Sequence, residues 1–344
     1  MNYKITIADI ARELNITPAT VSRALSDHPG ISEKTKKSVH QTAHRLNYKR
    51  NRIASSLRSG KSHVIGVLIP SAEINFFGSV VHGIESMANG HDYTVLIYQS
   101  NETRDCEVKG IETFLGARVD GILASIAKET TDYSHFLEIW KRGIPLVFFD
   151  RVNDELGIPS VVVDDYKGAW LATSHLIDQG YQRIAHIAGQ QHLKIFSDRM
   201  KGYRAALRDH GIAVDETLIY PGNVSIESGR AAIQHFLRMD RPPDAVFAIE
   251  DFTALGAIKE LKENGIAIPS AFGVIGFANE LFGEHITPGL STIDQQTVSM
   301  GKESFNLLLE LIAKKGIEQP IKNKVVLEPI PVYRDSSTKN KFVL

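Results

Sequence analysis

The stretch Thr6–Leu25, TIADIARELNITPATVSRAL, predicts two short helices joined by a tight turn. Apolar residues recur every three or four positions from Ile7 to Leu14, which is the spacing of one face of an amphipathic helix. Thr17 is expected to be the N-cap of the second helix, with Pro18 at the first helical position, where a missing N–H costs nothing. The stretch therefore predicts a helix-turn-helix.

A third helix is expected after Ser32, and the charge of this region indicates its partner. Residues 1–61 contain twelve Lys and Arg against four Asp and Glu, a net charge of about +8 that leaves about −9 on the remainder. A small basic domain joined to a larger acidic one indicates a polyanion as the partner of the first domain only.

From Val64 onward, apolar runs alternate with amphipathic segments of helix length. Such an alternation is typical of parallel sheets covered by helices on both faces. The runs are too many for one sheet, so we expect two α/β lobes with a boundary near Val163–Asp164. The runs are 64–69, 93–98, 121–124, 146–149, 161–163, 184–187, 245–249 and 274–277. The predicted fold class is a small all-α helix-turn-helix domain followed by a two-lobed α/β domain with parallel sheets.

Several classes of protein are disfavoured by the composition. Of the 344 residues, 43% are hydrophobic, yet no apolar run approaches the roughly 18 residues of a membrane span. The first residues lack the apolar core of a signal peptide, so we expect a cytoplasmic protein. Cys106 is the only cysteine, and the 13 histidines show no metal-ligand spacing. Without a nucleophile elbow or a dinucleotide fingerprint, we expect neither an enzyme nor a cofactor.

A helix that enters the major groove reads bases mainly from its first turns, which here expose Pro18, Ala19 and Arg23. Arg23 can form a bidentate pair with a guanine, whereas Pro18 and Ala19 can offer only apolar contact. Polar side chains around these helices are expected to contact phosphate: Thr6, Thr17, Thr20, Ser22, Ser32, Thr35 and Asn51. The alternative is that the hydroxyls only cap helices and that Arg23 is solvated.

These residues carry a resemblance to the LacI/GalR (lactose and galactose repressor) family that extends from about Thr6 to about Arg334. The resemblance implies a periplasmic-binding-protein-like second domain and a hinge helix near residues 50–61. In the family the hinge inserts a leucine into the minor groove, and Leu57 matches it, with Ala54 beside it. This chain has Arg50 where relatives often have proline, which puts the start of the hinge in doubt.

Ligands of two-lobed α/β proteins lie between the lobes, at the carboxyl ends of strands. Polar and aromatic residues follow the expected strands, and aromatic rings, carboxylates and guanidinium groups suit sugars. The resemblance places effector contacts at Phe76, Phe77, Asp150, Arg199, Asp251 and Gln295. Val224 and Ala278 replace residue types common in the family, so the effector itself stays open.

The expected protein is a sequence-specific transcription regulator, most simply a repressor of carbohydrate-utilisation genes, controlled by a sugar-like effector. We expect a homodimer on a near-palindromic operator, with an interface from Val80, Val81 and Ile84 or from a helix after Glu280, unless these residues pack on the sheet. The alternatives are a purine- or partner-protein-controlled regulator, a solute-binding protein and a sugar-processing enzyme.

The expected boundaries follow from these assignments. Residues 1–49 form the DNA-binding domain, 50–61 the hinge, and 62–344 the effector-binding and dimerisation domain. Within the last, the first lobe comprises about 62–163 plus 293–324, and the second about 164–292 plus 325–338.

Overall fold

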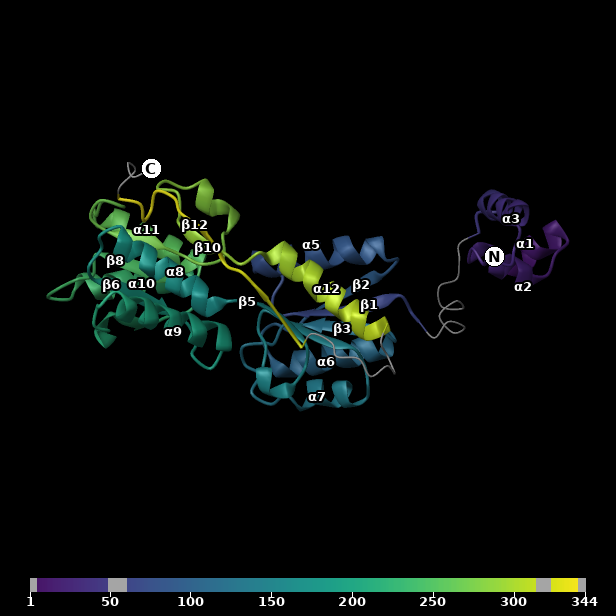
Figure 1. Ribbon diagram of the computed structural model, residues 1–344, viewed down its shortest axis with the longest axis horizontal. Helices are drawn as coiled ribbons and strands as arrows, with labels where there is room; N and C mark the ends of the chain where they lie inside the picture. Colours follow the sequence, from purple (N-terminus) through teal and green to yellow (C-terminus); the bar gives the residue numbers. More distant parts are fainter. Residues whose placement is uncertain (1–4, 49–60, 314–322, 340–344) are drawn as a thin grey trace. The chain divides into compact units, whose positions relative to one another are not determined.

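The computed structural model describes residues 5–48, 61–313 and 323–339. The chain divides into two compact units, Met1–Ser62 and His63–Leu344 (Figure 1). The predicted hinge residues Asn51, Ala54 and Leu57 lie outside the described residues.

The first unit consists of three helices, α1 (Ile7–Leu14), α2 (Pro18–Leu25) and α3 (Glu33–Arg45). Their apolar stripes meet in one small core formed by Ile10, Ala11, Val21, Ala24, Val39 and Ala43. As predicted, Thr17 caps α2 and Ser32 caps α3: their hydroxyls accept hydrogen bonds from Thr20 N and Thr35 N at 3.1 and 3.3 Å.

The first lobe of the second unit is built on a six-stranded parallel sheet with the order β11-β5-β4-β3-β1-β2. Its strands are β1 (Val64–Ile69), β2 (Thr94–Gln99), β3 (Gly121–Ala124), β4 (Leu146–Phe149), β5 (Ser160–Val163) and β11 (Lys324–Leu327). Its helices are α5 (Asn75–Gly90), α6 (Arg104–Gly116), α7 (Ser134–Lys141), the 3-10 turn η1 (Asp154–Leu156) and α12 (Thr297–Ala313).

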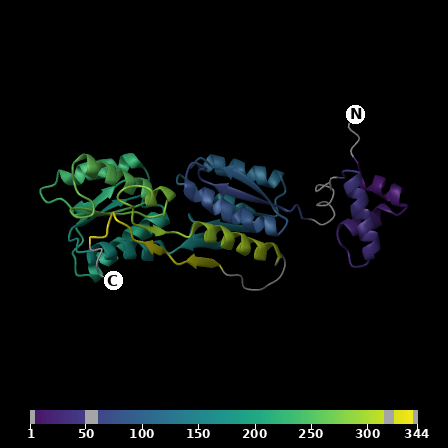
Figure 2. The same ribbon diagram turned by 90° about the horizontal axis from the view of Figure 1, so that it is seen from above.

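The inner strands β1, β3, β4 and β5 are buried on both faces, as their continuous apolar runs predicted, whereas the edge strands β2 and β11 are partly exposed. In β4, Val147 and Phe149 pack beneath α5 and α12, whereas Leu146 and Phe148 point to the opposite face, beneath α6 and α7. Figure 1 shows α5 on one side of the strands and α6 and α7 on the other, and Figure 2 shows the same lobe from above. Because successive side chains alternate between faces, only a strand covered twice can be apolar at every position.

The second lobe has a four-stranded parallel sheet with the order β7-β6-β8-β9. Helices α8 and α9 cover one face, and α10 and α11 cover the other. The strands are β6 (Ile184–Ala188), β7 (Ile219–Pro221), β8 (Ala245–Ala248) and β9 (Gly273–Ile275). The helices are α8 (Asp165–Asp178), α9 (Lys194–Asp209), α10 (Ile226–Leu237) and α11 (Asp251–Glu263), with the 3-10 turns η2 (Glu216–Leu218) and η3 (Leu281–Glu284).

The chain passes between the lobes three times, and the three crossings are bonded to one another. The first crossing follows β5, the second follows β10 (Thr292–Asp294), and the third runs from β11 to β12 (Ile330–Val332), which pairs antiparallel with β10. Asp164 N donates to Leu327 O at 3.0 Å, which joins the first crossing to the third. Gln296 Nε2 donates to Glu328 O at 2.7 Å, which joins the second to the third.

One lobe boundary and two candidate interface segments differ from expectation. We expected residues from 325 onward in the second lobe, but Lys324–Leu327 extends the first sheet beside β5 before the chain crosses. Val80 and Ile84, considered for a dimer interface, are fully buried in the first lobe's core because α12 covers them. Glu280 is followed by the short turn η3 and not by an α-helix.

Helices α5 and α12 approach each other closely through two glycines. A Cβ at Gly83 would lie 2.3 Å from Val298 O, and a Cβ at Gly301 would lie 2.1 Å from Val80 O. No real side chain tolerates such distances, so the helix pair depends on the absence of a side chain at both positions.

We predict that Gly301→Ala destabilises the second unit by about 1–3 kcal/mol, because the added methyl group forces the two helices apart. Gly78→Ala, on the exposed face of α5, is the control: a Cβ there meets nothing within 4 Å, and replacing a helical glycine should raise stability by about 0.5–1 kcal/mol. Urea unfolding of both variants tests this. Equal effects of the two substitutions would contradict the packing role of Gly301.

Candidate functional site

A cavity of about 610 Å³ lies between the two lobes, at the carboxyl ends of strands from both sheets. The first lobe contributes Glu73, Phe76, Phe77, Glu102, Lys128, Asp150 and Arg151 to its lining. The second lobe contributes Gln190, Phe196, Arg199, Asn223, Val224, Glu227, Glu250 and Phe252, and the second crossing contributes Gln295. Five of the six expected effector residues are therefore brought to one cavity.

The guanidinium of Arg199 is held from three directions at the base of this cleft. Its Nε donates to Asp165 Oδ1 at 2.8 Å, and its two terminal nitrogens donate to Ile249 O at 2.7 Å and to Gln295 Oε1 at 3.0 Å. The group also lies 3.7 Å from the centre of the Phe277 ring. These three bonds use three of the five N–H groups, which leaves two donors for a ligand.

Aromatic rings form much of the apolar lining of the cleft. Phe76 and Phe77 contact each other edge to face, with ring centres 5.1 Å apart. They also belong to the first lobe's core, and Arg151 lies 5.7 Å from the centre of the Phe77 ring. Phe196 and Phe252 face them from the second lobe. Rings beside hydrogen-bonding groups suit a small ligand that has apolar faces and polar edges.

Asp150 brings a buried carboxyl group, and Glu250 a half-buried one, to the cavity from opposite lobes. Burial raises the pKa of Asp150 to about 7 against the opposing charge of Arg151. Burial, reinforced by the neighbouring Asp251, raises the pKa of Glu250 to about 8. Both groups are therefore partly protonated near neutral pH, and each could donate or accept a hydrogen bond.

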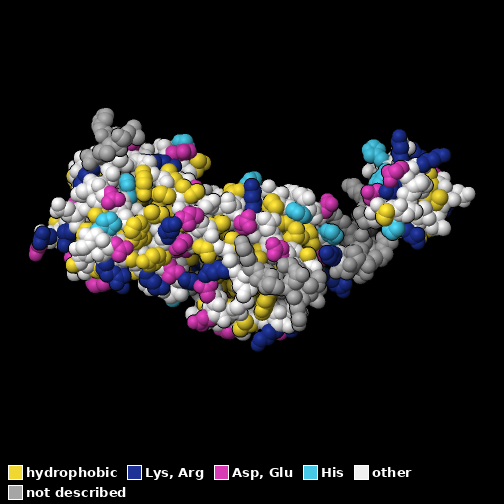
Figure 3. Space-filling model, in the orientation of Figure 1, with side chains coloured by type: hydrophobic (Ala, Val, Ile, Leu, Met, Phe, Trp, Pro, Cys, Tyr) yellow, Lys and Arg dark blue, Asp and Glu magenta, His cyan; other side chains and the backbone are white. Residues whose placement is uncertain are grey.

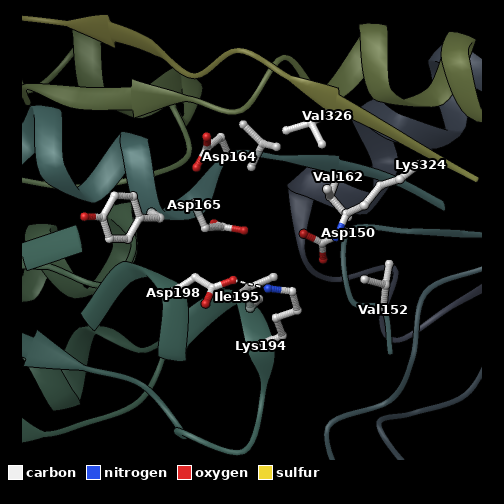
Figure 4. A pocket seen from close by; sticks show the side chains of 12 residues that line it. Asp150, Val152, Val162, Asp164, Asp165, Lys194, Ile195, Asp198, Lys324 and Val326 are labelled. Atoms are coloured by element: carbon white, nitrogen blue, oxygen red, sulfur yellow. Dashed lines mark hydrogen bonds and ion pairs between the residues drawn. The ribbon is translucent and has the colours of Figure 1, made fainter. Parts of the chain in front are cut away.

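Asp150 also lines a smaller pocket of about 220 Å³ beside the first and third crossings. In Figure 4 its carboxyl group lies across the pocket from Asp165. The walls come from both lobes, since Lys194 and Asp198 belong to α9 of the second lobe and Lys324 belongs to β11 of the first. Lys194 binds Asp198, and Lys324 binds Asp154 at 2.7 Å. Asp150 thus lies between the large cleft and the crossings.

Asp251 differs from its expected role, because it does not line the cavity. Its carboxylate is fully buried and accepts hydrogen bonds from Thr292 Oγ1 at 2.7 Å and Glu280 N at 2.8 Å. Burial raises its pKa to about 6 in spite of these bonds. The preceding residue, Glu250, lines the cleft instead, with Oε2 accepting from Phe252 N at the start of α11.

Sequence reasoning also missed the pair between Glu102 and Arg151, which are 2.7 Å apart in the cleft wall. Glu102 Oε2 additionally accepts from Lys128 N at 2.9 Å, so it fixes the loop that carries Lys128. The strand-end pattern did not indicate Glu102, because this residue lies three residues beyond β2, and none of the expected effector residues follows that strand.

Two hydrogen bonds join the lobes around the cleft. Asn75 Nδ2, at the start of α5, donates to Glu280 Oε2 at 2.8 Å. On another side, His192 Nε2 donates to Lys128 O at 2.8 Å. A ligand that changed the separation of the lobes would strain or relieve both contacts.

In the first unit, the exposed face of α2 carries the three expected base-reading residues. Pro18, Ala19 and Arg23 are exposed, whereas Val21 and Ala24 on the opposite face are buried. The Arg23 side chain has no hydrogen bond or ion pair with any described residue. It is therefore available to a partner.

The acidic groups of this unit are each neutralised. Asp9 binds Arg12 at 3.2 Å and Glu13 binds Arg45. Asp27 and Glu33 both bind Lys36, at 2.6 and 2.8 Å, so that Lys36 is buried and not available to phosphate. Among the described residues of α1, α2 and α3, the surplus positive charge lies on α2 and the first turns of α3, at Arg23, Lys34 and Lys37. Figure 3 shows Lys and Arg side chains protruding from the small unit.

The expected phosphate contacts have local roles as well. Asp9 accepts from both the backbone N and the hydroxyl of Thr6, at 2.9 and 2.7 Å. The Thr17 and Thr20 hydroxyls lie 2.9 Å apart, as do those of Ser32 and Thr35. Ser22 differs from these residues, because the local hydrogen bond is made by its backbone carbonyl, which accepts from the Ser26 hydroxyl, and not by its own hydroxyl. Capping and phosphate binding are compatible, since a hydroxyl has two lone pairs.

Within the described ranges, no group of three or more His, Cys, Asp or Glu residues could hold a metal ion. Among the same residues, no helix is long and apolar enough to cross a membrane.

The buried Asp150 predicts a particular dependence of stability on pH. A carboxyl group whose pKa rises from about 3.9 to about 7 on folding stabilises most below pH 4, and this contribution is lost as the pH rises through 7. Asp150→Asn should therefore unfold less easily than the wild type at pH 8, by up to about 4 kcal/mol, and should show a flatter profile between pH 4 and 7. Urea unfolding at several pH values measures this.

Glu112→Gln, an exposed substitution on α6, is the matched control and should follow the wild-type profile. If Asp150→Asn also followed the wild-type profile, the buried carboxyl group would not be the cause of the pH dependence.

Comparisons with known proteins agree with this geometry. Residues 62–330 match the periplasmic binding proteins and sugar binding domain of the LacI family, and residues 6–51 match the bacterial regulatory proteins of the lacI family. Catabolite control protein A of Priestia megaterium is 31% identical over 318 residues, which cover 92% of this chain and 95% of that protein.

Two solved structures have the same fold with bound ligands. The transcriptional regulator CelR in complex with cellobiose has a TM-score of 0.72 and 27% identity, covering 96% of this chain and 99% of that chain. A LacI family transcriptional regulator from Enterococcus faecium with bound ribose has a TM-score of 0.71 and 27% identity, covering 81% of this chain and 100% of that chain. The present chain therefore belongs to the LacI family of bacterial regulatory proteins, and it is a DNA-binding transcription regulator and not an enzyme.

Proposed function

We propose that this regulator represses carbohydrate-utilisation genes in the cytoplasm and that a small sugar-like molecule in the interlobe cleft controls its affinity for DNA. The observation that carries the proposal is the cleft itself: one cavity combines phenylalanine rings with the partly used Arg199 fork and with carboxyl groups from both lobes. The cellobiose and ribose complexes of similar proteins support this ligand class.

We assign base reading to Pro18, Ala19 and Arg23 on the exposed face of α2. Arg23 is the residue among them that can distinguish a guanine by a bidentate hydrogen bond. Phosphate contacts are assigned to Thr6, Thr17, Thr20, Ser22, Ser32, Thr35 and Asn51. Ala54 and Leu57 are assigned to the minor groove, where an apolar wedge bends the duplex.

The proposed unit on DNA is a homodimer, since two copies reading half-sites of a near-palindrome double the number of phosphate contacts. With Val80 and Ile84 buried, the exposed apolar side chains offer a better interface. Ile97 on the edge strand β2 is 49% exposed, and Leu281 in η3 is 67% exposed.

Ligand control would act through the lobes. A ligand that binds more tightly when the lobes are at one separation shifts the population of molecules toward that separation. By linkage, the ligand then alters the affinity for operator DNA. The test is to select operator fragments from genomic DNA with the purified full-length protein and to titrate them with sugars. Failure to retain any duplex at low salt would contradict the assignment of DNA targets, and DNA binding that no sugar alters would contradict the effector class.

We predict that Arg23→Ala weakens operator binding by about 1–3 kcal/mol and relaxes base preference at one position of each half-site. The fold should be unchanged, because the Arg23 side chain has no partner among the described residues. Arg12→Ala is the control, since Arg12 is also exposed but binds Asp9. Binding to a set of single-base operator variants measures the effect, and unaltered selectivity would remove Arg23 from the reading role.

A further inference from the structure

The cations of the cleft are largely neutralised by the protein itself. Arg199 Nε lies 2.8 Å from Asp165, and Arg151 lies 2.7 Å from Glu102; all four side chains are mostly buried. Neither guanidinium therefore offers an uncompensated positive charge to an anionic ligand. Of the basic side chains that line the cavity, Lys128 is the one without an ion pair to a described residue.

Several carboxyl groups of the cleft, by contrast, have no cationic partner among the described residues. Asp150 is only 6% exposed, yet its carboxyl group forms no hydrogen bond or ion pair with the part of the chain that the structure describes. Glu250 accepts one bond, from Phe252 N at 2.7 Å, and has no cationic partner there. Glu73 and Glu227 at the edge of the cavity are likewise unpaired.

This balance separates classes of ligand. A phosphate or carboxylate on the ligand would meet four unpaired acidic groups and one ammonium group, so sugar phosphates and sugar acids are disfavoured. Hydroxyl groups could accept and donate, but they would leave the buried acids without a counter-ion when ionised. A positively charged ligand group supplies what is missing, because buried charges are normally paired.

We propose that the ligand of this cleft is a polyhydroxylated amine of the amino-sugar type, whose ammonium group binds between Asp150 of the first lobe and Glu250 of the second. The hydroxyl groups then take the two N–H donors that Arg199 leaves open and the amide of Gln295. This inference rests on the proposed function, because it specifies the chemistry of the effector. An ammonium group bound from both lobes also favours their approach.

The test uses the full-length protein and probes that differ in a single group. Glucosamine, N-acetylglucosamine, glucose and glucose 6-phosphate form one such set, and the galacto and manno sets cover the configuration of the ring. Binding is measured by calorimetry and thermal shift. We expect at least one amine to bind at least about tenfold more tightly than its N-acetyl and hydroxyl counterparts, which is the effect of one buried charge-assisted hydrogen bond.

Two isosteric variants locate the effect. Asp150→Asn and Glu250→Gln should each reduce the preference for the amine over its neutral counterpart toward one, without a comparable loss of affinity for the neutral sugar. Glu112→Gln, an exposed substitution outside the cavity lining, should keep the wild-type preference. Because amines and N-acetylamines are first compared on the wild type, the proposal remains testable even if a variant does not fold.

The possible outcomes distinguish this inference from the function on which it rests. Tightest binding by a neutral or phosphorylated sugar would overturn the amine proposal and leave sugar control intact. Binding of operator DNA that none of the probes alters, together with no binding of any probe, would overturn both the amine and the sugar class.

Discussion

The Arg199 guanidinium is the point at which the cleft and the connections between the lobes meet. Asp165 belongs to the first crossing and Gln295 to the second, and the same guanidinium holds both. The third crossing is bonded to the other two through Leu327 and Glu328. A ligand that takes the remaining N–H groups of Arg199 would therefore touch a group that already fixes the geometry of the lobes. Ligand binding and a change in lobe separation would then both involve this side chain.

The two units differ in which of their charged groups are paired. In the first, every described acidic group is held by a basic one, so the remaining cations can face a polyanion without competition from their own domain. In the cleft the reverse holds, because the guanidinium groups are compensated and carboxyl groups are left over. Burying such groups costs stability, and a functional site is where that cost is expected.

Much of the fold could be predicted from local chemistry. Thr17, Pro18 and Ser32 begin helices where capping rules place them, and apolar runs such as Leu146–Phe149 are strands buried on both faces. Short strands with exposed positions were missed: Val326 in β11 is 54% exposed and the strand lies at the sheet edge, so its sequence lacks the continuous apolar signal. The consequence was a second-lobe boundary placed too early.

The residues of the cleft could be predicted because they follow strands, but their hydrogen-bond and ion-pair partners could not. Glu250 and Asp251 follow the same strand, and which of them faces the cavity is decided by the start of α11, where Thr292 and Glu280 hold Asp251 inward. The Arg151–Glu102 and Arg199–Asp165 pairs join residues 49 and 34 positions apart, and no local pattern encodes such distances. The charge balance that separates ligand classes therefore became visible only with the structure.

We infer that the response to ligand is transmitted through the contact of Arg199 with the first crossing. Asp165→Asn tests it directly, because Asp165 holds Arg199 but does not line the large cavity. The measurement is the ratio of operator dissociation constants with and without saturating ligand, using the probe that binds most tightly. We expect the variant still to bind the ligand and the operator while this ratio falls close to one. An Asp165→Asn protein that keeps the wild-type ratio would contradict it.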